Sequence, residues 1–238
     1  MCKRSSQNTL FDYFSSNLSQ KTKKVKTSCS QIKNSCIHID MKLLLASSSP
    51  RRSQLLNANG ISFSIDPPDI DETFDPNLSP SENAVCAAIK KAEAVVGRCN
   101  ALPVLAADTI VVLGEAILGK PKDRKDAVHM LKSLSGKEHM VITGVSLIWH
   151  ARNISWSHAE ETFVTFREIS EDLIDSYVKT GEPMDKAGGY AIQGGAKEWI
   201  ANYKGSLTNI IGLPMEPVLE QLDKIGLFCG DKNVKICQ

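Results

Sequence analysis

The chain has 238 residues, of which 42% are hydrophobic and 23% charged, and its formal net charge at pH 7 is +1. This composition is typical of a globular protein with one sizeable core. No stretch approaches the roughly 18 consecutive apolar residues of a membrane span, and the N-terminus lacks an apolar signal-peptide core, so we expect no membrane association and no secretion. Seven scattered cysteines form no C-x-x-C pair, which disfavours zinc and is typical of reduced thiols inside the cell.

The near-neutral net charge conceals a basic N-terminal segment and an acidic body. Residues 1–40 carry seven Lys and Arg against two Asp, whereas the remaining chain carries 21 basic against 25 acidic residues. The first segment is rich in Ser, Lys, Asn, Gln and Thr and lacks periodicity, so we predict a disordered tail. The acidic balance of the body predicts no direct nucleic-acid binding by the folded domain, although a few placed cations can still hold a small anion.

One apolar patch interrupts the tail at residues 7–14. It resembles the PIP box that docks proteins on the sliding clamp PCNA, in which a Gln, an aliphatic residue and two aromatic residues occupy fixed positions. Gln7, Leu10, Tyr13 and Phe14 fill all of these positions. On a single helical turn, Leu10, Tyr13 and Phe14 would lie on one side and serve as anchors for a hydrophobic pocket. We therefore predict PCNA as a partner; the alternative is that so short a motif arises by chance.

A basic run follows at residues 21–26. It can steer association or serve as a nuclear-import signal, and the simpler interpretation is a solvated tail. We expect a cytoplasmic protein that also has a route into the nucleus.

The folded part begins with a buried strand at residues 41–46, which leads into a hydroxyl-rich turn and a helix. Ser49 is a good N-cap and Pro50 suits the first helical position. Backbone N–H groups, the positive helix end, serine hydroxyls, Arg51 and Arg52 converge there. This pattern predicts an anion site, most naturally for phosphate; the alternative is a capped helix with solvated arginines.

A second strand is predicted at residues 61–66, followed by an acidic loop at 69–72. Acidic loops are usually solvated, but a carboxylate at a strand end can also meet a metal. A capping box at residues 79–82 then begins a helix that is predicted to end near Arg98.

The predicted apolar stripe of that helix has spacings typical of one buried face. Its members are Val85, Ile89, Ala92 and Val96. Lys91 lies at the edge of the stripe, where a lysine can reach into a cleft or remain an ordinary boundary residue.

The apolar run at residues 103–113 predicts a strand covered on both faces, but Asp108 and Thr109 interrupt it. An ionised carboxylate in such a place is costly unless a cation or hydrogen bonds compensate it. Asp108 therefore lies either in a turn at a strand end or at the open end of a sheet, facing a metal or a reacting water.

The remaining elements are predicted in chain order as follows. A hairpin at residues 113–118 leads to Lys120, which lies between a glycine and a turn-fixing proline. The pattern then predicts helices from 124 and 171, antiparallel strands over 140–149 and 154–166, a short strand at 190–193 and a final helix at 214–222. The glycine-rich stretch 185–195 lacks G-x-G-x-x-G spacing, which excludes a dinucleotide site. Gln193 can offer its amide to a base edge.

Four stretches occur together in order: Ala46-Ser47-Ser48-Ser49-Pro50-Arg51-Arg52, Ala106-Ala107-Asp108-Thr109, Gly119-Lys120-Pro121 and Asp185-Lys186-Ala187-Gly188. This set resembles the Maf family of house-cleaning nucleotide pyrophosphatases. The corresponding domain spans residues 41–224, with a C-terminal extension at 225–238. Ser48 departs from the family pattern, in which Gly is common at this place.

The resemblance implies an α/β fold, Maf/ITPase-like, with a long mixed β-sheet and flanking helices around a central cleft, and usually a homodimer. It implies cleavage of a nucleoside triphosphate to the monophosphate and pyrophosphate with a divalent metal, Mg or Mn. Asp108 would accept the proton of the attacking water and share the metal with Glu72. The phosphates would be held by Ser47, Arg51, Arg52, Lys91 and Lys120.

Thr109 and Gln193 fall where the family sets base specificity. The stretch Ala191-Ile192-Gln193-Gly194 resembles the branch that acts on dTTP and UTP, including related modified pyrimidine nucleotides, rather than the 7-methyl-GTP branch. Two alternatives stay open: a pyrophosphatase for a modified purine such as 7-methyl-GTP, and a catalytically silent regulatory protein associated with the clamp.

Overall fold

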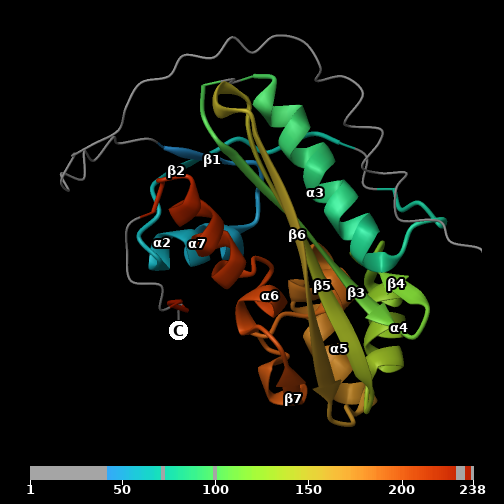
Figure 1. Ribbon diagram of the computed structural model, residues 1–238. Helices are drawn as coiled ribbons and strands as arrows, with labels where there is room; N and C mark the ends of the chain where they lie inside the picture. Colours follow the sequence, from blue (N-terminus) through green and yellow to red (C-terminus); the bar gives the residue numbers. More distant parts are fainter. Residues whose placement is uncertain (1–41, 71–72, 99–100, 229–233, 237–238) are drawn as a thin grey trace, which may run out of the picture. The chain divides into compact units, whose positions relative to one another are not determined.

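The computed structural model describes residues 42–70, 73–98, 101–228 and 234–236. The tail at residues 1–40, with its PIP-box-like motif at 7–14, and Glu72 lie outside the described residues. The described chain is an α/β protein with a seven-stranded mixed sheet (Figure 1). Among the described residues, no helix is both long and apolar enough to cross a membrane.

The sheet has the strand order β2-β1-β3-β5-β6-β7, and β4 pairs with β3 beside this path. β1 is parallel to β2 and β3, and the other pairs are antiparallel. The strands are β1 (Leu43–Leu45), β2 (Phe63–Ile65), β3 (Val104–Leu113), β4 (Ala116–Leu118), β5 (Glu138–Trp149), β6 (Ile154–Phe166) and β7 (Ile200–Lys204). The predicted antiparallel pair over 140–149 and 154–166 is confirmed as β5 and β6.

Helices cover both faces of this sheet. The α-helices are α2 (Pro50–Ala58), α3 (Pro80–Val96), α4 (Arg124–Leu134), α5 (Glu171–Lys179), α6 (Leu207–Ile211) and α7 (Met215–Lys224). Short 3-10 helices are η1 (His150–Arg152), η2 (Glu182–Asp185), η3 (Ala187–Gly189) and η4 (Lys197–Trp199). α3 packs across β3, β5 and β6 (Figure 1).

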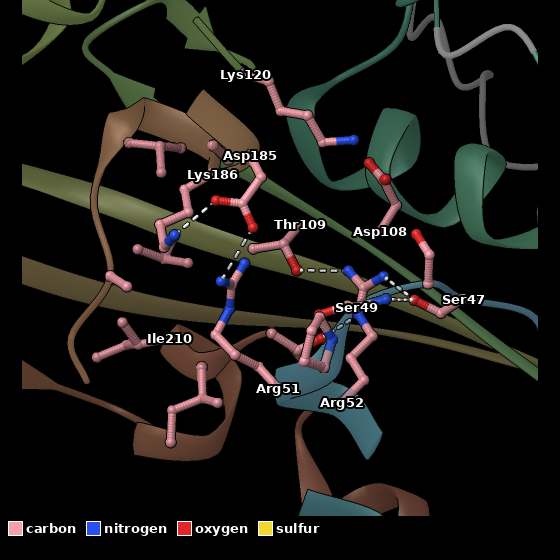
Figure 2. Close-up of a pocket in the computed structure, with 18 of the residues that line it drawn as sticks. Ser47, Ser49, Arg51, Arg52, Asp108, Thr109, Lys120, Asp185, Lys186 and Ile210 are labelled. Atoms are coloured by element: carbon pink, nitrogen blue, oxygen red, sulfur yellow. Dashed lines mark hydrogen bonds and ion pairs between the residues drawn. The ribbon is translucent and has the colours of Figure 1, made fainter. Parts of the chain in front are cut away.

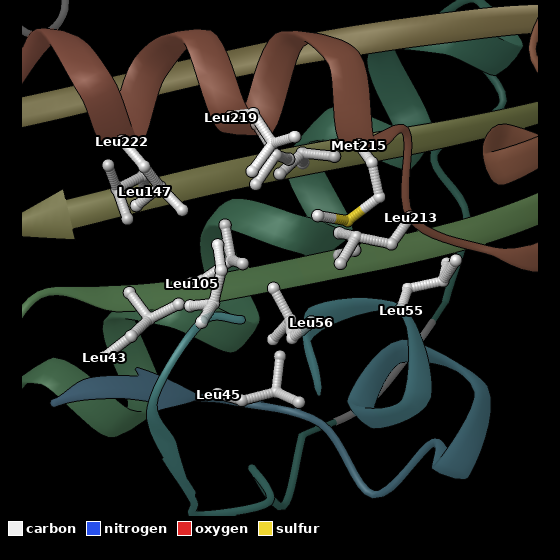
Figure 3. Close-up of a cluster of buried hydrophobic side chains, with 14 of the residues drawn as sticks. Leu43, Leu45, Leu55, Leu56, Leu105, Leu147, Leu213, Met215, Leu219 and Leu222 are labelled. Carbon is white, nitrogen blue, oxygen red and sulfur yellow. The ribbon is translucent and has the colours of Figure 1, made fainter. Parts of the chain in front are cut away.

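The alternation of β3 divides the core into four clusters. On one face, Leu105 belongs to a leucine-rich cluster with α2 and α7 (Figure 3), whereas Val111 belongs to an aromatic-rich cluster with α4 and α5. On the α3 face, Ala106 and Ile110 belong to two smaller clusters. Because side chains alternate along a strand, Asp108 lies between the two clusters of one face and Thr109 between the two of the other. The polar pair therefore marks the place where the apolar core is interrupted.

The predicted stripe of α3 was partly wrong. Val85 and Ile89 are only half-buried, whereas Ala84, Ala88 and Lys91 are buried together with Ala92 and Val96. The helix crosses β5 at Gly144, where an added Cβ would overlap the backbone of Ala84. Because α3 lies so close to β5, the helix face with small side chains is buried, whereas the larger Val85 and Ile89 lie on a half-buried face.

Two further findings concern the C-terminal third. The strand predicted at residues 190–193 was wrong, because this segment forms turns, and the edge strand β7 lies at 200–204 instead. In the C-terminal extension, Leu227 and Val234 pack against the leucine-rich cluster. The Asn59 side chain also donates to the Lys235 carbonyl at 2.9 Å and accepts from its N–H at 2.9 Å.

Gly144→Ala should destabilise the fold, because its methyl group would force α3 away from β5 and β3. We expect the free energy of unfolding to fall by about 1–3 kcal/mol, which urea denaturation measures. Gly97→Ala is the matched control, since Gly97 has helical dihedral angles and open surroundings. Equal stability of both variants would contradict the close-packing explanation.

Candidate active site

A cleft of about 440 Å³ opens where β1 ends and β3 is interrupted by its polar pair (Figure 2). Its walls come from the β1–α2 turn, β3, the segment around Lys120, η2 and η3, the turn at residues 191–193, and the end of α6. The structure brings eight of the site residues identified from sequence to this cleft: Ser47, Arg51, Arg52, Lys91, Asp108, Thr109, Lys120 and Gln193.

The N-terminus of α2 faces this cleft. Ser49 is the N-cap residue and Pro50 takes the first turn, but the Ser49 side chain makes no capping hydrogen bond. The first turn also carries no acidic residue. The positive end of the helix dipole is therefore not compensated by its own cap, which favours binding of an anion.

Arg52 is held by three hydrogen bonds to the protein. Its Nε donates to the Gly212 carbonyl at 2.8 Å, and its Nη1 donates to Ser47 Oγ at 2.9 Å. Its Nη2 donates to Thr109 Oγ1 at 3.1 Å. Gly212 presents this carbonyl at the end of α6 with φ of 117°, a conformation that L side chains rarely adopt. The guanidinium is thus a fixed positive charge that joins α2, β3 and α6.

The direction of the hydrogen bonds at Thr109 can be assigned. Thr143 Oγ1 donates to the Asn209 carbonyl at 3.1 Å, which uses its only hydrogen. Thr143 must therefore accept from Thr109 Oγ1 at 3.0 Å. Thr109 in turn accepts from Arg52, so its hydroxyl hydrogen points away from the cleft. Thr109 can offer a ligand its methyl group or a remaining lone pair, but no donor.

Asp108 forms a buried ion pair with Lys91. The distance from Lys91 Nζ to Asp108 Oδ1 is 2.5 Å, and the two residues are 7% and 8% exposed. Gly144 lies opposite Asp108 on β5 and admits α3 close enough for this contact. The sequence allowed two interpretations of Lys91, as a residue that reaches into a cleft or as an ordinary boundary residue. The structure places it in the lining of the cleft.

A second charged group lies across the cleft. Asp185 Oδ1 accepts from Lys186 Nζ at 2.6 Å, and its Oδ2 lies 3.7 Å from Arg51 Nη1 (Figure 2). Burial raises the pKa of Asp185, but Lys186 and Arg51 outweigh this effect and leave the pKa below its ordinary value. The carboxylate is therefore ionised near neutral pH and orients Arg51. The sequence identifies Asp185 and Lys186 only as part of a family motif, because two adjacent opposite charges give no distinct signal of a site.

Lys120 reaches the cleft from the turn after β4. The Gly119 carbonyl accepts from Gly188 N–H at 3.0 Å, which fixes the turn against η3. Figure 2 shows the side chains of Lys120 and Asp108 extending into the same part of the cleft. Gln193 also lines the cleft, in the turn that follows the buried Tyr190.

The described side chains of the cleft supply some of the oxygen ligands that a hard divalent cation such as Mg²⁺ requires. Asp108 supplies one carboxylate, and Mg²⁺ in phosphate-binding sites is commonly held by one or two carboxylates together with substrate oxygens. Over the described ranges, no three His, Cys, Asp or Glu side chains gather into a group that could hold a metal. The described side chains thus suit a metal that arrives with a phosphate ligand.

The fold and this cleft define an α/β protein with a binding site for a polyanion, in which cations surround one buried carboxylate. The family model described as "Maf-like protein" matches residues 42–225, and the chain belongs to this family.

Curated relatives match most of the chain. The chain is 43% identical over 194 residues to the dTTP/UTP pyrophosphatase of Syntrophus aciditrophicus, covering 81% of this chain and 95% of that protein. It is 46% identical over 191 residues to the dTTP/UTP pyrophosphatase of Symbiobacterium thermophilum, covering 79% and 97%. The protein of the same name from Bacillus velezensis is 42% identical over 186 residues, covering 78% and 97%.

The Lys91–Asp108 pair should be strongly coupled. Lys91→Met or Asp108→Asn alone leaves one buried charge without its partner, so each should lower the free energy of unfolding by about 3–5 kcal/mol. The double variant removes both charges and should be more stable than either single variant. Urea denaturation of the four proteins tests this double-mutant cycle; additive effects would contradict the coupling.

Proposed function

We propose that this chain is a nucleoside triphosphate pyrophosphatase that hydrolyses dTTP, UTP and related modified pyrimidine nucleotides to the monophosphate and pyrophosphate. One observation carries the proposal: a buried carboxylate, Asp108, lies in a single cleft with Arg51, Arg52 and Lys120. The identity to dTTP/UTP pyrophosphatases supports the substrate class.

The cations and the helix end would bind the triphosphate. The positive end of α2, with Arg51 and Lys120, suits the dispersed negative charge of phosphates in the transition state. Arg52 is fixed by Ser47, Thr109 and Gly212. A fixed charge loses little freedom when the substrate binds, so Arg52 serves this chemistry without reorganisation.

Asp108 is the proposed proton acceptor. Water adds to a phosphorus of the α–β anhydride, the bridging P–O bond breaks, and pyrophosphate leaves from the monophosphate. Asp108 takes the proton of the attacking water, while Lys91 holds the carboxylate in place and compensates its charge. A divalent Mg or Mn ion, held by Asp108 and Glu72 with phosphate oxygens, would supply charge neutralisation.

The base would be recognised at the wall that carries Gln193. An exposed amide can both donate and accept, which matches the alternating donors and acceptors on the edge of uracil or thymine. The Thr109 hydroxyl is committed to Arg52 and Thr143, so its part in specificity would be that of a methyl contact or of a support for Arg52.

Pyrophosphate release from a nucleotide panel tests this function. With Mg²⁺ or Mn²⁺, dTTP and UTP should be the preferred substrates, and Asp108→Asn should lower kcat by roughly 10²–10⁴-fold. The Lys91→Met/Asp108→Asn double variant controls for misfolding caused by breaking the Lys91–Asp108 ion pair. Preference for 7-methyl-GTP would favour the purine alternative, and no turnover by the wild-type protein would favour a silent regulatory protein.

We further propose that the tail docks on the sliding clamp PCNA through Gln7, Leu10, Tyr13 and Phe14. The complete motif in a polar segment supports this partner. A peptide of residues 1–20 should bind PCNA, and the Tyr13→Ala/Phe14→Ala peptide should bind at least about tenfold more weakly, because its two aromatic anchors are lost. Calorimetric titration measures both; equal affinities would reduce the motif to coincidence.

We also propose a homodimer, on the basis of family membership, and a cytoplasmic location with access to the nucleus through the basic run at residues 21–26. Sedimentation at several concentrations and imaging of the tagged full chain address these two proposals.

A further inference from the structure

Glu182 is a half-buried carboxylate two residues before Met184, which lines the cleft, and no step of the proposed chemistry uses it. Its Oε1 accepts from the Tyr177 hydroxyl at 3.0 Å, and its Oε2 accepts from the Gly195 N–H at 3.3 Å. The side chain therefore bridges α5 and the turn that carries Gln193, Gly194 and Gly195, called the Gln193 turn below.

The glycines of that turn provide the space for the carboxylate. A Cβ added to Gly194 would overlap Glu182 Oε1, and one added to Gly195 would lie 3.1 Å from the Tyr177 ring. Gly194 does not have a positive φ, so its backbone conformation does not require glycine. Close approach of Glu182 is thus the physical reason for glycine at this position.

The turn that carries Gln193 belongs to no strand. Two of its backbone bonds are local: Gly194 N–H donates to the Ala191 carbonyl at 3.3 Å, and Lys197 N–H donates to the Gly194 carbonyl at 3.0 Å. Its attachment to α5 runs through Tyr177, which forms a hydrogen bond with the Ala191 backbone, and through the Glu182 bridge to Gly195. Glu182 therefore attaches the turn on the far side of Gln193 from Ala191.

Tyr177 gives that attachment a rigid base. Its ring is buried and packs edge-on against Trp199 with centroids 4.9 Å apart. Burial, reinforced by the charge of Glu182, raises the pKa of the Tyr177 hydroxyl, so it stays protonated and donates. The carboxylate is consequently held on the aromatic-rich core rather than on a mobile surface group.

The main chain of Glu182 serves the other end of the cleft. Its carbonyl accepts from Lys186 Nζ at 2.6 Å, and the same ammonium group binds Asp185, which faces Arg51. Truncation of the side chain leaves this carbonyl in place. The two ends can therefore be separated experimentally: the side chain holds the Gln193 turn, and the backbone supports the phosphate end.

We infer that Glu182 is a positioning residue for base recognition, which holds the Gln193 turn through Gly195 and so sets the discrimination between pyrimidine bases. This inference rests on the proposed function, because it assigns the Gln193 wall to the base. In this role Glu182 acts through the Gln193 turn and does not itself contact the substrate.

Steady-state kinetics of Glu182→Ala with dTTP, UTP and dCTP test the inference. A lost charged hydrogen bond corresponds to roughly a tenfold to hundredfold effect, and we expect a rise in KM for dTTP of this order, with kcat changed little and the preference over dCTP reduced. Glu182→Gln should restore most of the preference, because an amide oxygen can accept from Gly195 while its NH₂ donates to Tyr177. Unchanged preference in Glu182→Ala, or no rescue by Glu182→Gln, would overturn the inference.

A matched control separates positioning from stability. Glu82 also accepts two hydrogen bonds, from Ser79 N–H at 2.8 Å and Ser79 Oγ at 2.7 Å, but both belong to the capping box of α3 and neither reaches the Gln193 turn. Glu82→Ala should lower stability without a change in base preference; an equal loss of preference in this variant would contradict the inference. If Glu182→Ala fails to fold, Gly194→Ala displaces the carboxylate from its place and should give the same shift in preference.

Binding measurements keep this test distinct from that of the proposed function. Calorimetry with pyrophosphate alone should give equal affinities for wild type and Glu182→Ala, whereas dTMP should bind the variant roughly tenfold more weakly. Failure of the wild-type protein to hydrolyse any nucleotide would reject the proposed function. Equal dTMP affinity in the two proteins would reject the role of Glu182, whatever the turnover.

Discussion

The ion pair between Lys91 and Asp108 is the interaction on which the arrangement of the site depends. A carboxylate in the middle of a buried strand is tolerated because an ammonium group reaches it at 2.5 Å. That reach requires α3 to lie close to β5, which in turn requires the small side chains of α3 and the absence of a side chain at Gly144. The packing of one helix thus decides whether the central acid of the cleft is compensated.

The cations of the cleft differ in their surroundings. Arg52 is fixed by three protein acceptors, whereas Arg51 faces the ionised Asp185 and Lys120 is exposed. For the triphosphate substrate that we propose, Arg52 would supply a charge that is already fixed beside Ser47 before the substrate binds.

Glycines serve two distinct purposes around the site. Gly212 adopts a positive φ and aims its carbonyl at Arg52, whereas Gly144 and Gly194 make room for a helix backbone and a carboxylate. The second use leaves no mark on local backbone geometry. Close approach of this kind joins α3 to the sheet at Gly144 and the Gln193 turn to Glu182 at Gly194.

The sequence by itself determined the chemistry that is available and most of the elements that carry it. Asp108 stood out because a charge in an apolar run is costly, and the Ser- and Arg-rich start of a helix indicated an anion site by local rules alone. Only the tertiary structure decided which partners these groups have. Contacts between residues far apart in the chain set three features: the buried face of α3, the hydrogen-bond direction at Thr109 and the bridge of Glu182 to Gly195. Hydrophobic periodicity does not reveal such contacts, because it reflects which side chains are large and apolar and not how closely two backbones approach. The segment that carries Gln193 was predicted as a strand because its composition suits one. It forms a turn instead, because it pairs with no neighbouring strand, and pairing cannot be inferred from local composition.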